Sequence, residues 1–167
     1  MIEIFCVLFF VSAPYGRHIR SGWGKEISAK VGWIFMESPC LYIVFILGFL
    51  YRNELDLVHQ VFLFIWFLHY IHRTLIYPFF ANVKGKKMPL SIALSAFAFN
   101  HVNAFVQTIG IYTFTNYADN WLSSLTFICG LMIFLIGMII NIFSDYYIIY
   151  LRKIKGPGYH MPSKFLY

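Results

Sequence analysis

Residues 57–80, LVHQVFLFIWFLHYIHRTLIYPFF, are apolar and long enough to cross a bilayer as a helix, and they decide the fold. The second half of this stretch nevertheless contains two histidines, an arginine and a threonine. An arginine at the centre of a membrane helix costs roughly 2.5–3.5 kcal/mol on insertion, so it normally faces protein or water. On a helix, Tyr70, Arg73, Thr74 and Tyr77 lie on one face. This face indicates either a site of chemistry or a cluster of hydrogen bonds that only joins helices.

The composition of the whole chain is that of an integral membrane protein. Of its 167 residues, 60% are hydrophobic and 12% are charged, whereas soluble domains average about 45–50% and about 25%. The net charge of +6 predicts no nucleic-acid partner, because the basic residues lie in short loops where membrane topology explains them. The three cysteines lie in apolar segments without a pairing pattern, and they predict neither disulfides nor a zinc site.

Four other apolar segments accompany the segment at residues 57–80. They are residues 31–51, 89–114 and 122–151, and a short first segment at residues 2–13 that looks like the end of a helix whose beginning is missing. A bilayer requires about 20 apolar residues per helix. We therefore predict an all-α polytopic membrane bundle with about five transmembrane segments, forming a single membrane domain over residues 1–167.

The charges of the loops predict the orientation of these segments. Four basic residues separate the first two segments, one separates the second and third, three follow the third, none follows the fourth, and four follow the fifth. Loops rich in Lys and Arg stay in the cytosol. The pattern therefore places the N-terminus in the lumen and the C-terminus in the cytosol.

This orientation gives the depth of the polar residues within the membrane. At a rise of 1.5 Å per residue, Glu37 lies roughly 9 Å below the cytosolic surface, and Tyr70, Arg73 and Asp145 lie roughly 9–15 Å below it. Burying such groups separately in lipid would be costly. We therefore expect these segments to share a cavity that opens to the cytosol.

Two of these groups have a structural interpretation beside the functional one. Glu37 is followed by Pro39, which kinks a helix and opens a pocket there. A buried glutamic acid can donate a hydrogen bond to a carbonyl oxygen, whereas the alternative is a salt bridge with Arg73. Asn141, Asp145 and Arg152 share one helical face, which suits a ligand with hydroxyls, amides and phosphates. The alternative there is a helix end with an interfacial arginine.

Other polar residues in the membrane segments carry less weight. Residues 89–114 contain amides and a histidine that we interpret mainly as interhelical packing, namely Asn100, His101, Asn103 and Gln107. Cavity lining is the alternative for Asn103 and Gln107. His69 and His72 form a single HxxH pair, which is weak evidence for a metal, and we expect no metal site. No GxGxxG motif follows a strand, so a nucleotide would have to bind in a helical membrane cavity.

With these motifs in place, the chain resembles the steroid 5α-reductase family of integral membrane, NADPH-dependent reductases. APYGRH, WGKEISAKVGW, MESP, HYIHRTLIYP, GMIINIFSDYYIIYLRK and GYHMP follow one another in the order of the family, from about residue 13 to the last residue. The resemblance implies hydride transfer from NADPH to the β carbon of a 3-oxo-Δ4 steroid and protonation of the α carbon. It also implies a location in the endoplasmic reticulum membrane of a eukaryote.

The resemblance implies roles for particular residues. Glu37 and Tyr70 match the catalytic glutamate and tyrosine, which hydrogen-bond the substrate ketone and stabilise the enolate that develops. The positions that match NADPH-contacting or nearby basic residues of the family are Tyr15, Arg73, Tyr77, Lys84, Lys86, Asn141, Asp145 and Arg152. The implied partners are a lipid-like enone such as a steroid, and the membrane lipid itself.

The chain departs from the family pattern in residues and in length. Met36 replaces an amide, Phe143 replaces a histidine and Ile149 replaces an arginine. These changes leave polyprenols and enoyl-CoA thioesters as alternative substrates. The chain ends at PSKFLY, where the family continues into further membrane helices that complete the NADPH site. We therefore expect a fragment of a longer reductase, and the alternative is a truncated, non-catalytic protein that binds lipid.

Overall fold

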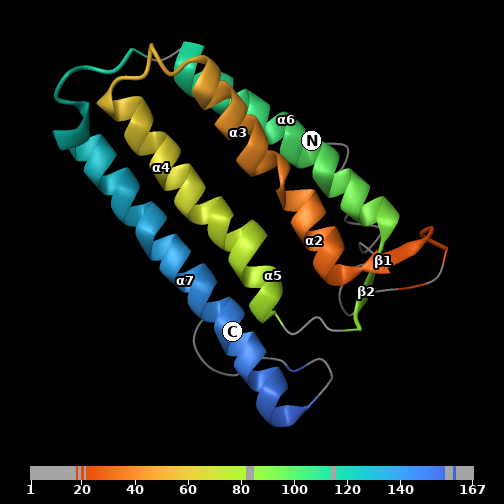
Figure 1. The fold of residues 1–167 in the computed structure, drawn as a ribbon. Helices are drawn as coiled ribbons and strands as arrows, with labels where there is room; N and C mark the ends of the chain where they lie inside the picture. Colours follow the sequence, from red (N-terminus) through yellow and green to blue (C-terminus); the bar gives the residue numbers. More distant parts are fainter. Residues whose placement is uncertain are drawn as a thin grey trace.

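The computed structural model describes residues 18, 20, 22–81, 85–113, 116–156 and 160. In this part of the chain, helices dominate and form a bundle, as the sequence predicts (Figure 1). Three of the described helical segments are long and apolar enough to cross a membrane, namely Ala29–Leu50, Leu90–Thr113 and Leu125–Lys155. The predicted first segment, residues 2–13, lies outside the described residues. The all-α membrane class is therefore confirmed.

The segment predicted at residues 31–51 is two helices, α2 (Ala29–Glu37) and α3 (Pro39–Leu50), with a break at Ser38. Proline has no backbone N–H, so Pro39 cannot continue the hydrogen-bond ladder of α2. The Ser38 hydroxyl donates to the Phe35 carbonyl at 2.8 Å and so satisfies an acceptor next to the break. Glu37 is the last residue of α2 and is placed at this interruption.

The segment predicted at residues 57–80 is helical over its whole length but irregular. It consists of α4 (Leu57–Ile71), a π-helical turn η2 (His72–Ile76) and α5 (Tyr77–Phe80). Asp56 caps the start of α4, because its carboxylate accepts from the His59 backbone N–H at 2.9 Å. π-Helical turns are rare and occur often at functional sites. This one carries Arg73.

The last two segments are continuous helices, α6 (Leu90–Thr113) and α7 (Leu125–Lys155). The first turn of the segment predicted at residues 122–151 is instead a 3-10 turn, η3 (Trp121–Ser123). Helix α7 begins after Ser124, whose hydroxyl accepts from the Phe127 N–H at 3.2 Å. It continues to Lys155 and ends at Gly156, whose positive φ of 81° favours glycine.

A short antiparallel ribbon joins the loops that precede α2 and α6, and the sequence did not predict it. Strand β1 (Glu26–Ser28) pairs with β2 (Lys87–Pro89), with Ile27 opposite Met88. Met88 is buried against Gly32 of α2, where any Cβ would clash with the methionine Sδ. The ribbon therefore fixes the starts of both helices beside each other.

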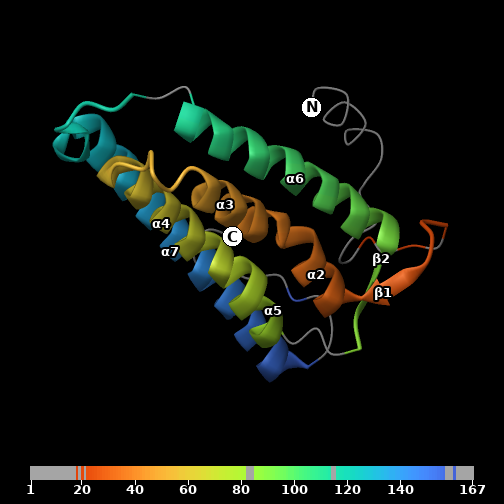
Figure 2. The same ribbon diagram turned by 45° about the horizontal axis from the view of Figure 1, so that its top comes forward.

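The helices form two neighbouring groups. Figures 1 and 2 show α2 and α3 running along α6, and α4 lying beside α7. Cys40, Val44 and Ala104 form a small buried core between α3 and α6, and Trp66 and Tyr70 of α4 pack against it. Most of the large apolar side chains of α7 are exposed instead, and Leu151 is its buried residue. Such an apolar surface suits contact with lipid.

Candidate functional site

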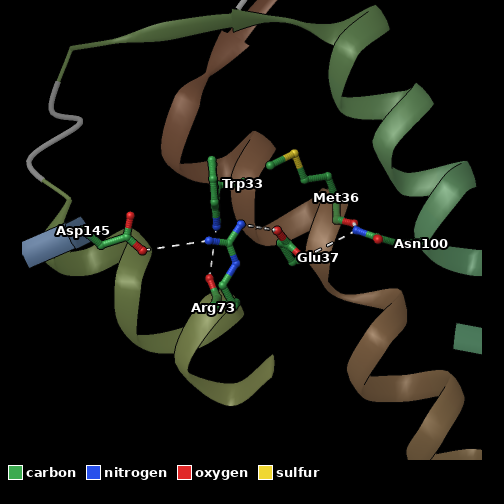
Figure 3. Close-up of polar contacts among 6 residues, drawn as sticks. All are labelled: Trp33, Met36, Glu37, Arg73, Asn100 and Asp145. Carbon is green, nitrogen blue, oxygen red and sulfur yellow. Dashed lines mark hydrogen bonds and ion pairs between the residues drawn. The ribbon is translucent and has the colours of Figure 1, made fainter. Parts of the chain in front are cut away.

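An arginine between two carboxylates lies at the centre of the candidate site (Figure 3). The Arg73 Nη2 atom lies 3.1 Å from Glu37 Oε1, and its Nη1 atom lies 3.9 Å from Asp145 Oδ2. The side chains of Glu37 and Asp145 are 9% and 17% exposed. Three segments distant in sequence, α2, η2 and α7, therefore meet here. Glu37, Arg73 and Asp145 therefore cluster as expected, and the salt bridge that was the structural interpretation of Glu37 is present, whereas the shared cavity that opens to the cytosol stays a prediction.

The Trp33 side chain of α2 contacts both the backbone carbonyl and the guanidinium group of Arg73. The Trp33 Nε1–H donates to the Arg73 carbonyl at 3.0 Å, in the π-helical turn. The guanidinium carbon of Arg73 lies 4.9 Å from the centre of the Trp33 ring and 5.9 Å from that of Tyr77, distances at which cation–π attraction operates. The position of the guanidinium is therefore set by α2 as much as by its own helix.

Asn100 of α6 holds Glu37 from the opposite side. Its Nδ2 atom donates to the Met36 carbonyl at 2.7 Å and lies 3.5 Å from Glu37 Oε2. Sequence reasoning interpreted Asn100 as a packing residue and did not connect it with Glu37. The available signal was an amide in an apolar segment, which does not identify its partner.

Tyr70 of α4 packs against the buried core that contains Cys40. It also interacts electrostatically with Glu37 and Arg73. The Trp66 ring lies 4.8 Å from the Tyr70 ring, and the Trp66 N–H donates to the Cys40 carbonyl at 2.8 Å. The two residues with implied catalytic roles, Glu37 and Tyr70, thus lie on different helices, within electrostatic range of each other.

Basic groups approach the site from the loop end of the bundle. Arg152, near the end of α7, interacts electrostatically with Tyr77 and with Lys86 in the loop before β2. Partial desolvation, together with the positive charge of Arg152, lowers the pKa of Lys86. Two cations held near each other in this way favour an anion between them. A phosphate-bearing ligand fits this charge arrangement.

A buried acceptor without a hydrogen-bond partner lies beside Arg73. Asp145 Oδ2 is buried without a hydrogen-bond partner, although Arg73 lies within ion-pair distance. Such an oxygen can accept from a hydroxyl or amide of a ligand. Asn141 lies one turn before Asp145 on α7.

The remaining sequence predictions fall outside this cluster or outside the described residues. Tyr15 and Lys84 belong to the residues that the structure does not describe. The His69 ring packs edge-on against Tyr70, with ring centres 5.0 Å apart. Within the described part of the chain, no group of three or more His, Cys, Asp or Glu residues has the geometry to hold a metal.

Comparison with known proteins gives one consistent family. The family model described as 3-oxo-5-alpha-steroid 4-dehydrogenase matches residues 86–167. The chain is 36% identical over 165 residues to the steroid 5-alpha-reductase DET2 of Arabidopsis thaliana, covering 93% of this chain and 62% of the relative. It is 39% identical over 165 residues to that of Solanum lycopersicum, covering 95% of this chain and 62% of the relative.

A mammalian relative shows the same pattern. The chain is 32% identical over 156 residues to the 3-oxo-5-alpha-steroid 4-dehydrogenase 1 of Homo sapiens, covering 90% of this chain and 59% of the relative. The chain thus spans less than two thirds of the length of these relatives.

Proposed function

We propose that the chain, which is similar to steroid 5-alpha-reductases over more than nine tenths of its length, belongs to their family and takes part in the NADPH-dependent reduction of the 4,5 double bond of a 3-oxo-Δ4 steroid. The observation that carries this proposal is the cluster of Glu37, Arg73 and Asp145 from three segments, with Tyr70 of α4 near enough to interact electrostatically with Glu37 and Arg73. In our proposal, Glu37 and Tyr70 offer two hydrogen-bonding groups to one substrate oxygen.

The proposed chemistry needs a polarised ketone. Hydrogen bonds to the 3-oxo oxygen draw electrons toward it and make C5, the β carbon, more electrophilic. Tyr70 donates such a bond in its ordinary neutral state, whereas Glu37 donates once it carries a proton. The negative charge that develops on the oxygen is then stabilised by both groups. A proton taken up at C4 completes the reduction.

The residues of the site suit a dinucleotide cofactor. When bound, NADPH supplies the hydride. Arg152 and Lys86 provide positive charge for phosphates, and the unsatisfied Asp145 oxygen accepts from a hydroxyl or amide. Asn141, Tyr77 and Arg73 line the same region in our proposal, and Tyr15 and Lys84 are proposed contacts outside the described residues.

The membrane setting suits such a substrate. The exposed apolar faces and the three long helices of the described residues belong to an integral membrane protein. We infer that the protein lies in the endoplasmic reticulum, with its N-terminus in the lumen and its C-terminus in the cytosol. In this orientation the basic end of the site faces the cytosol. An apolar steroid would reach the site from the lipid bilayer.

The experiment compares two carboxylate variants in membranes that contain the protein. Glu37→Gln removes the buried carboxyl group, and Glu54→Gln makes the same change in the exposed turn after α3. We expect Glu37→Gln to lower steroid reduction by about 100-fold or more, in line with loss of an acid–base group. Glu54→Gln should retain full activity, and both variants should insert equally.

The outcomes separate this function from its alternatives. Equal turnover by Glu37→Gln and the parent protein would remove the catalytic role of Glu37. Reduction of a polyprenol or an enoyl-CoA lipid, without reduction of a steroid, would replace the substrate class. Steroid or lipid binding without NADPH-dependent turnover would identify a non-catalytic lipid-binding protein.

A further inference from the structure

The break between α2 and α3 leaves backbone acceptors that side chains from elsewhere occupy. Pro39 has no N–H, and the carbonyls before it must find other donors. The Ser38 hydroxyl donates a hydrogen bond to the Phe35 carbonyl at 2.8 Å. The Asn100 side-chain amide of α6 donates one to the Met36 carbonyl at 2.7 Å. The second of these bonds is the one that joins the break to another helix.

The same amide nitrogen reaches the side chain of the next residue. Asn100 Nδ2 lies 3.5 Å from Glu37 Oε2, while Arg73 binds the other oxygen, Oε1, at 3.1 Å (Figure 3). One side chain therefore contacts both the backbone just before Glu37 and the tip of its carboxyl group. Because Glu37 is 7% exposed, these contacts are made out of reach of bulk solvent.

We propose that Asn100 is a positioning residue that fixes Glu37 for the reaction proposed above. This inference rests on the proposed function, in which Glu37 hydrogen-bonds the substrate ketone. Asn100 touches neither the reacting carbon nor the ketone in this proposal, and it acts only through Glu37.

The chemistry of an amide N–H explains how it orients the carboxyl group. Such a group donates and does not accept, so the oxygen that faces it stays an acceptor. Arg73 donates to the other oxygen, Oε1, so each oxygen of the carboxyl group faces its own N–H donor and the plane of the group is fixed. Loss of the amide would leave the Met36 carbonyl unsatisfied and let the carboxyl group rotate.

The test uses Asn100→Leu, which keeps the approximate volume and removes the donor, with Asn103→Leu on the same helix as the matched control. The first readout is the infrared carboxylate band of Glu37 in the purified protein, identified by its absence in Glu37→Gln. Hydrogen bonds shift this band, so it should move in Asn100→Leu and stay in place in Asn103→Leu. This readout requires no cofactor or turnover.

The second readout is turnover in a cycle of variants. Asn100→Leu should lower kcat about tenfold, the effect expected for a lost hydrogen bond to a charged group. In a Glu37→Gln background the same change should have no further effect on the residual rate, because Asn100 acts through Glu37. A merely structural role would lower the residual rate by the same factor.

The outcomes distinguish the two proposals. A Glu37 band that is the same in Asn100→Leu and the parent protein overturns the positioning role, whatever the activity. An equal loss of kcat in both backgrounds overturns it as well. A parent protein without steroid reduction overturns the proposed function, and the infrared band then decides whether Asn100 still orients Glu37.

Discussion

Replacing Arg73 by methionine should destabilise the protein strongly, because it leaves two buried carboxylates without their cation. Glu37 and Asp145 are 9% and 17% exposed. Removing one partner of a buried ion pair typically costs 3–5 kcal/mol, and the residual exposure here favours about 3 kcal/mol. Neutralising Glu37 at the same time should recover part of this loss, because the double variant buries one charge fewer.

The distances predict the relative interaction free energies of Arg73 with each of the two carboxylates. Glu37 forms a hydrogen-bonded pair with Arg73 at 3.1 Å, and hydrogen bonds to charged groups contribute about 1.5–3 kcal/mol. Asp145 lies at 3.9 Å, beyond hydrogen-bond distance, so we expect a coupling below about 1 kcal/mol. The coupling between Arg73 and Glu37 should therefore be the larger one.

The assay is reversible unfolding in mixed micelles with increasing sodium dodecyl sulfate, followed by tryptophan fluorescence. Double-mutant cycles combine Arg73→Met with Glu37→Gln and, separately, with Asp145→Asn. Arg52→Met is the matched control, because Arg52 lies in an exposed turn and bonds only the Phe49 carbonyl and ring among the contacts described. Additive effects of Arg73→Met and Glu37→Gln, or a larger coupling to Asp145, would refute this account of the site.

Two other predictions concern the ends of the helices. Arg152→Ala should raise the NADPH concentration required for half-maximal activity more than the steroid concentration, because its charge lies at the basic end of the site. Equal increases in both would assign Arg152 to helix packing. Asp56→Ala should cost about 1 kcal/mol of stability through loss of the α4 cap. The backbone N–H of His59 lowers the pKa of Asp56, so this contribution is complete above the unfolded value of about 4 and is lost as pH falls through the lower folded value. Asp56→Asn keeps a cap acceptor and should remove that acid dependence. An unchanged acid limb in the unfolding curve of Asp56→Asn would contradict the assignment.

Hydropathy is sufficient to predict the helical segments among the residues that the structure describes, and loop charge adds an expected depth for their polar groups, which stays a prediction. The sequence predicts residues 57–80 as one span, and they are helical throughout, because their apolar length leaves few other structures in lipid. The same patterns predict that Glu37, Arg73 and Asp145 lie at a similar depth in the membrane. Their lateral contact is expected from the cost of burying each charge alone.

Hydropathy and charge patterns do not predict the irregular features, namely the donor at the helix break, the π-helical turn and the ribbon. Pro39 indicates a kink, but the identity of the donor to Met36 depends on how α6 is rotated, which an apolar sequence hardly specifies. The π-helical turn at Arg73 likewise forms through tertiary contacts such as the bond from Trp33. The ribbon escapes prediction because it has three residues per strand, too few for an alternating pattern to be recognised.

The ribbon formed by β1 and β2 restricts where insertions and deletions can be tolerated in α2 and α6. Ser28 and Pro89 are the last ribbon residues before α2 and α6, and the antiparallel pairing sets them at opposite ends of the ribbon, with Ser28 opposite Lys87 and Pro89 opposite Glu26. Each helix therefore starts at a fixed position relative to the other. Each residue inserted into a helix shifts the remainder of that helix by 1.5 Å and turns it by about 100°. One codon gained between Ser28 and Glu37, or between Pro89 and Asn100, would separate the carboxyl group from its amide. The number of residues in these two intervals should therefore be fixed. The turn after Tyr51 lies outside both intervals, so its length can vary without separating Glu37 from Asn100.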